Sequence, residues 1–279
     1  MASVLVTGAS TGIGRACALR LDRLGHLVFA GVRKGADAEA LRAQASGRLV
    51  PVMLDVTDAA LVDDLAAAVQ AAVGDRGLGG LVNNAGIGIP GPVELLGLDR
   101  WRHQLEVNVI GQVAVTKALL PALRDARGRI VFMGSVFGRL APPLVAPYAA
   151  SKFAIEAIAS SLAEELRPWG IRVVVVEPGV IATDIWDKGR ARTDALEASM
   201  TPEARSMYRG QLDRARALAE EARSSGIDPE RVAEAVQDAL FSARPRRRYQ
   251  VGADARAGAL AARLLPDRAL GPVLRRLRP

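Results

Sequence analysis

Short apolar runs rich in Val, Ile and Leu alternate along the chain with longer stretches of Ala, Leu and charged residues. Six runs have the composition of strands and occupy residues 4–8, 26–32, 48–55, 78–86, 127–135 and 170–179. The stretches between them, such as 58–73 and 151–166, repeat their apolar residues at helical spacing. Because these strands are apolar on both faces, they suit a parallel sheet that helices cover. The pattern predicts a Rossmann-like α/β fold: a doubly wound parallel sheet of about seven strands with helices on both faces.

No internal repeat, linker or change of composition divides the sequence, so we expect a single domain over residues 1–279. One polar, helix-prone stretch at about 184–223 interrupts the alternation after the sixth strand. Open α/β sheets bind ligands beyond the carboxyl ends of their strands, so we expect this insertion to cover a substrate. Apolar segments that carry Arg at about 257–279 predict a C-terminal helical tail, packed at a subunit interface or over the substrate pocket.

The composition narrows the class of protein further. Half of the 279 residues are hydrophobic, which is enough for a large core. The single cysteine, Cys17, excludes a disulfide framework and a cysteine-rich metal site, and its position in the first predicted helix indicates core packing. No basic and apolar leader precedes the first strand, and no uncharged apolar run approaches ~18 residues. We therefore expect a cytoplasmic protein without an integral membrane segment.

The net charge of +7 belongs to the end of the chain. Ten arginines and two aspartates lie in residues 244–279, while the rest of the chain is nearly neutral. The run "RPRRR" has no interleaved aromatic residues apart from Tyr249, and no zinc-finger, helix-turn-helix or RNA-binding pattern is present. We interpret the charge as a solvated basic face and expect no nucleic-acid partner. Weak peripheral contact of the tail with anionic lipid is the alternative.

The first predicted strand runs into a glycine-rich turn, "TGASTGIG" at 7–14, which opens a helix. Its glycines Gly8, Gly12 and Gly14 are spaced G-x-x-x-G-x-G, which differs from the usual dinucleotide fingerprint G-x-G-x-x-G. Backbone N–H groups at a helix N-terminus, together with the helix dipole, bind phosphate groups well. The turn therefore indicates a pyrophosphate site, and a glycine-rich turn without a ligand is the alternative interpretation.

Three polar residues further along form a second constellation. Tyr148 and Lys152 are four residues apart at the start of a predicted helix, and hence on one face of it. Ser135 follows the fifth predicted strand, where groups that act on a ligand gather in this architecture. A tyrosine with a pKa of ~10 is a poor base at neutral pH, and a nearby ammonium lowers that pKa. Alternatively, Tyr148 and Lys152 are an exposed pair on an amphipathic helix.

These motifs, in this order, resemble the short-chain dehydrogenase/reductase family. The resemblance runs over about residues 3–185 and rests on "TGASTGIG", "NNAG" at 83–86, "NVIG" at 108–111, Ser135, "YAASK" at 148–152 and "PGVIAT" at 178–183. The stretches "GDRGLGGLVNNAGI" and "ARGRIVFMGSVFGR" are similar to the branch with retinol and 17-beta-hydroxysteroid dehydrogenases. The resemblance implies an NAD(P)-dependent oxidoreductase that interconverts a secondary alcohol and a ketone or aldehyde, assembled as a homodimer or homotetramer.

The resemblance also implies a role for each matching position. The catalytic residues are Ser135, Tyr148 and Lys152, together with Asn108, which supports a water-linked proton relay to Lys152; a structural asparagine at a helix kink is the alternative for Asn108. The reaction needs no metal, and no His, Cys or carboxylate cluster offers a site. The implied cofactor contacts are Gly8, Ser10, Gly12, Ile13 and Gly14 at the pyrophosphate; Asp55 and Val56 at the adenine; Asn83, Ala85 and Gly86 beside the ribose; Tyr148 and Lys152 at the nicotinamide ribose; and Pro178, Gly179, Ile181 and Thr183 at the carboxamide.

The end of the second predicted strand bears on the choice of cofactor. An acid about 20 residues after the glycine turn binds the ribose 2′-hydroxyl of NAD. Here the strand ends near Val32, Arg33 and Lys34 follow, and no acid appears before Asp37. A guanidinium pairs well with a 2′-phosphate, so we expect NADP(H) to be preferred, with NAD(H) possible. The family's second basic marker is replaced by Thr11, and a solvated basic turn is the alternative for Arg33.

Two other classes of protein are compatible with parts of the sequence. A serine hydrolase would need G-x-S-x-G, but Met133 stands at the first glycine position. A nucleotide-sensing regulator without catalysis would keep the glycine turn and lose Ser135, Tyr148 or Lys152, and all three are present. Apolar positions near the site predict a lipophilic substrate. They are Ile87, Val136, Phe137, Leu144, Val145, Trp186, Met200 and Met207. The alternative is that several of them are core residues.

Overall fold

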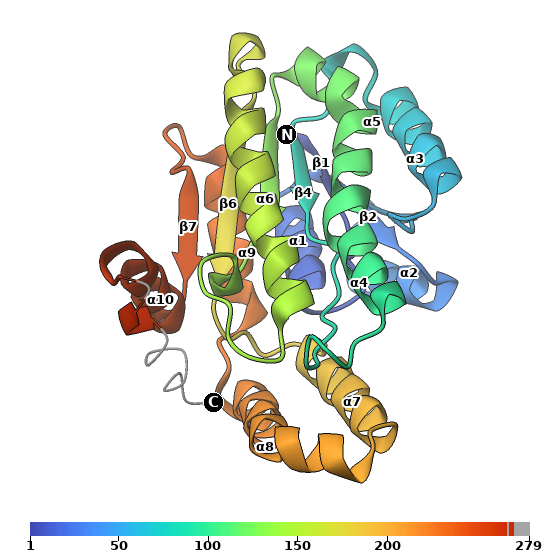
Figure 1. Cartoon of the computed structure of the whole chain (residues 1–279). Helices are drawn as coiled ribbons and strands as arrows, with labels where there is room; N and C mark the ends of the chain where they lie inside the picture. The colour runs from blue at the N-terminus through green and yellow to red at the C-terminus, as the bar shows by residue number, and fades with distance from the viewer. Residues whose placement is uncertain (267, 271–279) are drawn as a thin grey trace.

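The computed structural model describes residues 1–266 and 268–270, and its centre is one parallel sheet of seven strands (Figure 1). Their order across the sheet is β3-β2-β1-β4-β5-β6-β7. The strands are β1 (Ser3–Val6), β2 (Leu27–Val32), β3 (Leu49–Met53), β4 (Gly80–Asn83), β5 (Arg129–Met133), β6 (Arg172–Pro178) and β7 (Arg248–Val251). The order runs outward from β1 to β3 and then restarts on the other side of β1 at β4. This reversal confirms the predicted doubly wound sheet and places a switch point between β1 and β4.

Helices cover both faces of the sheet (Figure 1). One face packs on α1 (Gly12–Arg23), α2 (Gly35–Arg42) and α9 (Pro229–Phe241). The other face packs on α3 (Ala59–Val73), α5 (Gly111–Ala126) and α6 (Ala146–Glu165). Successive strand residues alternate between the two cores: Val4 and Val6 belong to the first, and Leu5 between them belongs to the second. This alternation explains why a strand such as β1 carries apolar residues at successive positions.

Cys17 lies on α1 and is fully buried in the first core. Burial raises the pKa of its thiol to about 12. A thiol with this pKa stays protonated at neutral pH and is a poor nucleophile. The residue therefore packs as a small apolar side chain, as the sequence predicted. In the described part of the chain, no helix has both the length and the apolar character that crossing a membrane requires.

The seventh strand differs from the sequence interpretation of residues 244–248 as a solvated basic face. Arg248 is the first residue of β7, and Tyr249 is 8% exposed in the first core. Its neighbours on the strand, Arg248 and Gln250, bond to buried carboxylates on β6 and α6. The strand was missed because its polar residues hide the apolar alternation that indicates a half-buried strand.

The chain after β7 forms α10 (Ala253–Leu264), which begins four residues before the predicted tail. Ala255 on this helix packs on Val136 and Leu140, in the loop after β5. The predicted tail at 257–279 includes residue 267 and residues 271–279, which lie outside the described residues.

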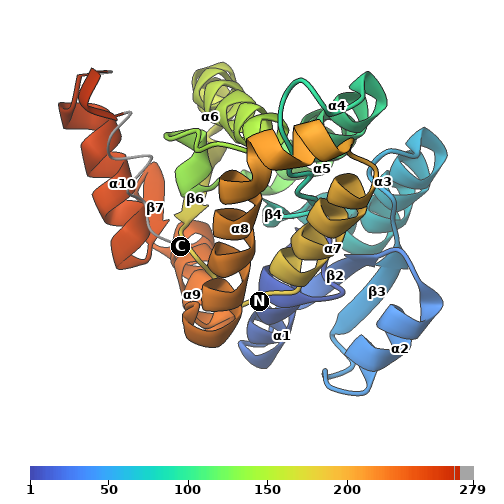
Figure 2. The same ribbon diagram turned by 60° about the horizontal axis from the view of Figure 1, so that its bottom comes forward.

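The stretch predicted as an insertion at 184–223 forms α7 (Ile185–Ala198) and most of α8 (Pro202–Ser225). Figure 2 shows both helices lying across one end of the sheet. The pair has a small core of its own, which includes Met200 and Leu212. Arg216 on α8 ties the helices together through Asp194, at 2.9 Å, and Glu197 on α7. We refer to residues 184–225 as the cap.

Candidate active site

The glycine turn between β1 and α1 is closely packed, with no room for a side chain. Gly8 and Gly12 have positive φ angles of 64° and 54°, which glycine adopts without strain. A Cβ on Gly14 would lie 2.2 Å from the carbonyl oxygen of Gly8, and one on Gly8 would lie 2.8 Å from Cα of Ala85. In the described structure the Thr11 side chain does not cap α1, so the N–H groups of the first turn remain available to an anion. The turn therefore fits a cofactor pyrophosphate.

The end of β4 is fastened to this turn through Thr7. The Thr7 hydroxyl oxygen accepts hydrogen bonds from the N–H groups of Asn84, at 3.0 Å, and Ala85, at 2.9 Å. The side-chain amide of Asn84 donates to the carbonyl oxygens of Thr7 and Gly8, at 3.0 and 3.1 Å. These bonds hold the glycine turn against β4 at the switch point. Sequence reasoning did not single out Asn84, although it is the second residue of the quoted "NNAG".

Asn83, which the resemblance placed beside the ribose, directs its side chain elsewhere. It is fully buried, and its amide donates to the Thr116 hydroxyl on α5 at 2.8 Å. Any contact of Asn83 with the cofactor would therefore be made by its backbone. Of the neighbouring positions expected near the ribose, Gly86 lies close to Asn108, since a Cβ on Gly86 would be 3.3 Å from the Asn108 amide oxygen.

Ser135, Tyr148 and Lys152 lie together where β5 ends. Ser135 is the second residue after β5, and its hydroxyl oxygen accepts the N–H of Phe137 at 3.1 Å. Tyr148 and Lys152 lie in the first two turns of α6, with the Lys152 Nζ 5.5 Å from the centre of the Tyr148 ring. The ammonium donates to the carbonyl oxygen of Met133 at 2.7 Å, two residues before Ser135. The helix and the strand end are thus fixed to each other at the residues predicted to be catalytic.

The ionisation of this cluster differs from the sequence expectation. The pKa of Tyr148 lies above its ordinary value, because burial of the phenol outweighs a hydrogen bond with Ser135 that lowers it. Burial also lowers the pKa of Lys152 to about 8. We expected the ammonium to lower the tyrosine pKa. In this structure the removal of both groups from water is the larger effect.

Asn108 lies in a π-helical turn, Glu106–Ile110, between α4 (Leu98–Leu105) and α5. Its amide oxygen accepts the N–H of Ile87 at 2.8 Å, and its amide nitrogen donates to the carbonyl oxygen of Ile87 and the hydroxyl of Ser151, at 3.0 and 3.1 Å. Gln104, which the sequence did not indicate, bonds to Ile87 and Ile89 of the same loop. Asn108 thus joins the loop after β4 to α6 at an irregular turn, and its part in a proton relay stays a prediction.

The segment expected to hold the nicotinamide carboxamide, 178–183, contacts the glycine turn. A Cβ on Gly12 would lie 3.0 Å from the Thr183 methyl group. Asp254, at the start of α10, accepts the N–H of Val180 at 2.6 Å and leaves no room for a side chain on Gly179. The indole N–H of Trp186 donates to the carbonyl oxygen of Ile181 at 2.8 Å. Asp254 was missed, because only the fold brings α10 to this segment.

Arg33 lies near Asp55, where the adenosine end of a cofactor is expected. Burial alone would raise the pKa of Asp55, but hydrogen bonds from Thr57 and the positive charge of Arg33 hold it below its usual value. Arg33 is exposed directly after β2. Arg192 of the cap donates to the carbonyl oxygen of Gly88 at 2.6 Å. Burial, followed by the charges of Arg100 and Arg33, lowers the pKa of Arg192. Arg192 therefore lies near enough to Arg100 and to Arg33 to feel the charge of each.

The apolar residues proposed to line a substrate pocket do not all face one space. Leu144 and Met200 pack in the small core beneath the cap, and Val136 packs against α10. Met207 is 68% exposed on α8. Leu144, Met200 and Val136 are thus core residues in the described structure, Met207 faces solvent, and their place in a substrate pocket stays a prediction. Phe137 does lie beside Tyr148, with its ring perpendicular to the tyrosine ring at a centroid distance of 6.3 Å.

A glycine cradle at the switch point of a doubly wound sheet defines a dinucleotide-binding protein. The model of the short chain dehydrogenase family matches residues 2–194. The chain belongs to this family, in the branch of the retinol and 17-beta-hydroxysteroid dehydrogenases. It is an oxidoreductase that uses a nicotinamide cofactor to interconvert alcohols and carbonyl compounds.

Three relatives support this assignment. The chain is 38% identical to mouse retinol dehydrogenase 5 over 98% of its own length and 87% of the relative's. It is 34% identical to the NADPH-dependent 3-dehydrocapnine reductase of Ornithobacterium rhinotracheale, over 98% and 96% of the two chains. It is 40% identical to mouse estradiol 17-beta-dehydrogenase 2, over 67% and 51%.

Solved structures agree with the fold. A short-chain dehydrogenase from Streptomyces avermitilis has a TM-score of 0.81 at 30% identity, over 99% of this chain and 94% of that one. A Burkholderia phymatum enzyme in complex with NAD has a TM-score of 0.78 at 29% identity, over 94% and 92%. A Burkholderia cenocepacia enzyme in complex with NADP has a TM-score of 0.74 at 27% identity, over 100% and 98%.

Proposed function

We propose that this protein reduces lipophilic ketones or aldehydes, and oxidises the matching alcohols, with Tyr148 as the acid and base. The observation that carries this proposal is the cluster of Ser135, Tyr148 and Lys152 at the end of β5, on the side of the sheet where the glycine turn opens. Lys152 is held to the strand end by its bond to Met133. This geometry places a proton carrier, a hydrogen-bond donor and a cation in one place.

The residues of the cluster divide the chemistry among them. The nicotinamide ring, when bound, supplies or accepts the hydride. In reduction, Tyr148 donates the proton that the carbonyl oxygen takes up, and the Ser135 hydroxyl donates a hydrogen bond to the same oxygen as negative charge develops on it. Because burial raises the Tyr148 pKa, the phenol is protonated at neutral pH, which is the form that reduction requires. Lys152 holds the ribose hydroxyls and stabilises the phenolate left after proton transfer.

A lipophilic substrate is supported by the apolar side chains beside Tyr148. Phe137 presents its ring to the tyrosine, and a Cβ on Gly88 would lie 3.9 Å from both Ile185 and Tyr148. Two of the relatives are named as dehydrogenases of retinol and estradiol, which are apolar alcohols. A panel of retinol, estradiol, a short-chain alcohol and a sugar alcohol, followed by the absorbance of reduced cofactor, tests this. We expect turnover of the first two; turnover of the sugar alcohol alone would contradict the proposal.

We further propose that the protein prefers NADP(H), with NAD(H) as a weaker cofactor. Arg33 and Arg100 lie close enough to Arg192 for their charges to act on it. Among the described residues, neither Arg33 nor Arg192 forms an ion pair with a carboxylate. A 2′-phosphate would give Arg33 an ion-pair partner.

Arg33→Asp is expected to reverse the cofactor preference. The substitution replaces a partner of the 2′-phosphate with a carboxylate that repels it, so kcat/KM for NADPH should fall by ~10-fold or more while that for NADH is retained or rises. Arg48→Asp is the matched control, because Arg48 is exposed before β3, at the opposite end of the sheet, and carries the same change of charge. Equal kcat/KM values for both cofactors, in the wild type and in Arg33→Asp, would show that Arg33 does not recognise the phosphate.

We also propose a homodimer or homotetramer in the cytoplasm. Exposed apolar side chains on neighbouring elements support an assembly: Ile110 is 52% exposed before α5, and Phe153 is 45% exposed on α6. Light scattering coupled to size-exclusion chromatography measures the assembled mass. The cytoplasmic location is proposed from the sequence alone.

A further inference from the structure

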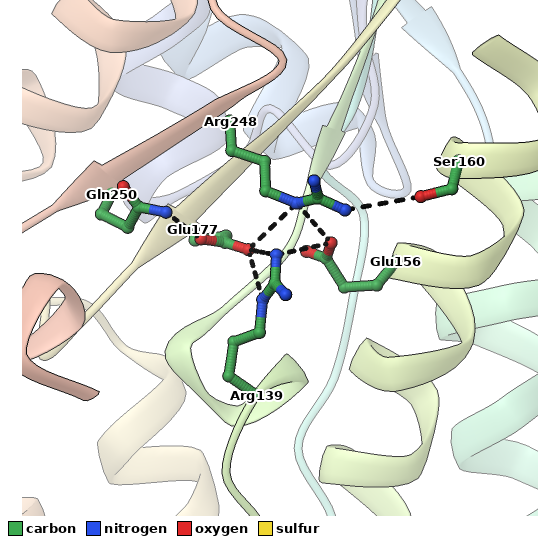
Figure 3. A network of polar contacts seen from close by, with 6 residues as sticks. All are labelled: Arg139, Glu156, Ser160, Glu177, Arg248 and Gln250. Carbon is green, nitrogen blue, oxygen red and sulfur yellow. Dashed lines mark hydrogen bonds and ion pairs between the residues drawn. The ribbon is translucent and has the colours of Figure 1, made fainter. Parts of the chain in front are cut away.

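Two buried carboxylates and two half-buried guanidiniums form a polar network (Figure 3). Its members come from four parts of the fold: Arg139 from the loop after β5, Glu156 from α6, Glu177 from β6, and Arg248 and Gln250 from β7. Glu177 is 1% exposed, and Glu156 is also buried. We refer to these five residues as the ionic network.

The contacts of the ionic network are close and shared. Arg139 donates to one oxygen of Glu177 through Nε and a terminal nitrogen, at 2.9 and 2.8 Å, and to Glu156 at 3.3 Å. Arg248 Nε lies 3.0 Å from Glu156 and 3.7 Å from Glu177. Gln250 donates to the other oxygen of Glu177 at 2.7 Å. Each guanidinium thus bridges both carboxylates, which balances two buried negative charges that neither arginine could balance alone.

Two members of the ionic network, Glu156 and Arg139, follow catalytic residues closely in the chain. Glu156 follows Tyr148 and Lys152 at four-residue intervals, so the three share one face of α6. Arg139 comes four residues after Ser135. The turn between them packs tightly on α6, since a Cβ on Gly138 would lie 3.1 Å from the carbonyl oxygen of Lys152.

Ser135 is therefore held to α6 from both sides. On the N-terminal side of Ser135, the carbonyl oxygen of Met133 accepts the hydrogen bond from Lys152. A Cβ on Gly134 would lie 3.4 Å from the Glu156 oxygen Oε1. That oxygen is buried and has no hydrogen-bond partner among the described residues. On the C-terminal side of Ser135, the guanidinium of Arg139 donates a hydrogen bond to Glu156. The same helix that carries Tyr148 and Lys152 thus fixes the loop that carries Ser135.

We propose that Arg139 and Glu156 are positioning residues for hydride transfer, which hold the Ser135 loop against α6 so that Ser135 and Tyr148 address the same substrate oxygen. Arg248 and Gln250 approach the carboxylates from β7 and have no contact with the Ser135 loop among the bonds described here. Arg248 and Gln250 therefore bind the two carboxylates from β7, on the side away from the Ser135 loop. The inference rests on the role proposed for Ser135.

The charge of Glu156 makes this positioning sensitive to pH. Burial, and then the neighbouring Glu177, raises the pKa of Glu156 to about 7, against the opposing effect of Arg139 and Arg248. These are the charged groups that face Glu156 from the Ser135 loop, β6 and β7, and Ser160 bonds to Arg248 from α6. Glu156 therefore loses its proton across neutral pH, and its attraction to Arg139 increases as the pH rises.

The first test compares the two arginines. Arg139→Gln is expected to lower kcat by ~10-fold with little change in the NADPH dissociation constant, because a displaced Ser135 impairs the reaction and leaves the glycine cradle intact. Arg248→Gln also breaks two ion pairs, but it should lower the melting temperature and keep kcat within about twofold. If Arg139→Gln does not fold, Arg139→Lys takes its place, and a smaller fall in kcat is expected. Equal effects of the two arginines on kcat would show that the network only stabilises the fold.

The second test uses pH and a matched glutamate. The kcat of Glu156→Gln relative to wild type should be close to one at about pH 6, where both side chains are neutral, and should fall ~3-fold or more at about pH 8.5. Glu164→Gln is the control, because Glu164 lies two turns further along α6 and pairs with Arg247 at the surface. The kcat of Glu164→Gln relative to wild type should stay constant between about pH 6 and about pH 8.5. A pH-independent ratio for Glu156→Gln would overturn the inference.

Ser135→Ala separates failure of this inference from failure of the proposed function. If Ser135→Ala retains wild-type kcat, the proposed catalytic role of Ser135 is wrong. If Ser135→Ala loses activity while Arg139→Gln and Glu156→Gln keep it, the proposed function stands and the positioning role is wrong. Each kcat is measured with the substrate of the panel that wild type converts fastest.

Discussion

Tyr148→Phe is expected to lower kcat by ~100-fold or more while the protein still binds its cofactor. The substitution removes only the hydroxyl, so the ring keeps its packing against Phe137 and Lys152. Without the hydroxyl, the cluster loses the group that we propose exchanges a proton with the substrate oxygen. Initial rates give kcat, and the fluorescence of bound NADPH gives the dissociation constant, which should change by less than about twofold.

Tyr208→Phe is the matched control for this prediction. Tyr208 lies on α8 of the cap, and its hydroxyl bonds to Glu94 at the surface. Its loss should leave kcat unchanged. Retention of more than about a tenth of the wild-type kcat in Tyr148→Phe would contradict the catalytic assignment.

Gly14→Ala is expected to abolish measurable cofactor binding. The added methyl group would lie 2.2 Å from the carbonyl oxygen of Gly8 and 2.4 Å from the Asn84 amide nitrogen, so the turn must shift away from β4. A shifted turn no longer presents its N–H groups to a pyrophosphate. Titration calorimetry with NADPH measures the loss, and circular dichroism of the free protein shows whether the sheet and helices persist.

Gly189→Ala is the control for the glycine substitution. Gly189 also lies within a helix, α7, and a Cβ there meets nothing within 4 Å. Cofactor affinity should match wild type, and helix propensity favours the alanine by roughly 1 kcal/mol. Wild-type affinity in Gly14→Ala would show that the turn does not hold the pyrophosphate.

The sheet and the catalytic cluster could be predicted because each depends on a local pattern. Val4, Leu5 and Val6 are all apolar because the two faces of β1 meet different cores, and a continuous apolar run marks that situation. Tyr148 and Lys152 come together through helical spacing. Ser135 joins them because parallel strands end at the same edge of the sheet, which is a property of the fold class.

The features that were missed depend on contacts between distant segments. Asn83 and Asn84 are adjacent, yet one bonds to α5 and the other to the glycine turn, and only the position of β4 decides which. Arg248 and Gln250 are polar because β7 passes two buried carboxylates. The sequence indicated a solvated basic face for the run at 244–248, which includes Arg248.

The pKa of Tyr148 and the buried face of α8 in the cap also depend on contacts between distant segments. The Tyr148 pKa was expected to fall beside an ammonium, but the degree of burial, which raises it, depends on how completely the surrounding elements exclude water. Met200 and Met207 are seven residues apart on or beside α8, yet one is buried and the other faces solvent. The face of α8 that meets α7 is set by the packing of the two helices.

The most direct test of the central claim is transfer of deuterium from cofactor to product. Wild-type protein is given NADPH that carries deuterium on both positions of nicotinamide C4, together with retinal or the best carbonyl substrate of the panel, and the alcohol is analysed by mass spectrometry. We expect one deuterium on the carbinol carbon with wild type, and formation of the labelled alcohol ~100-fold or more slowly with Tyr148→Phe. Unlabelled alcohol from wild type, or labelled alcohol formed equally fast by Tyr148→Phe, would contradict the central claim.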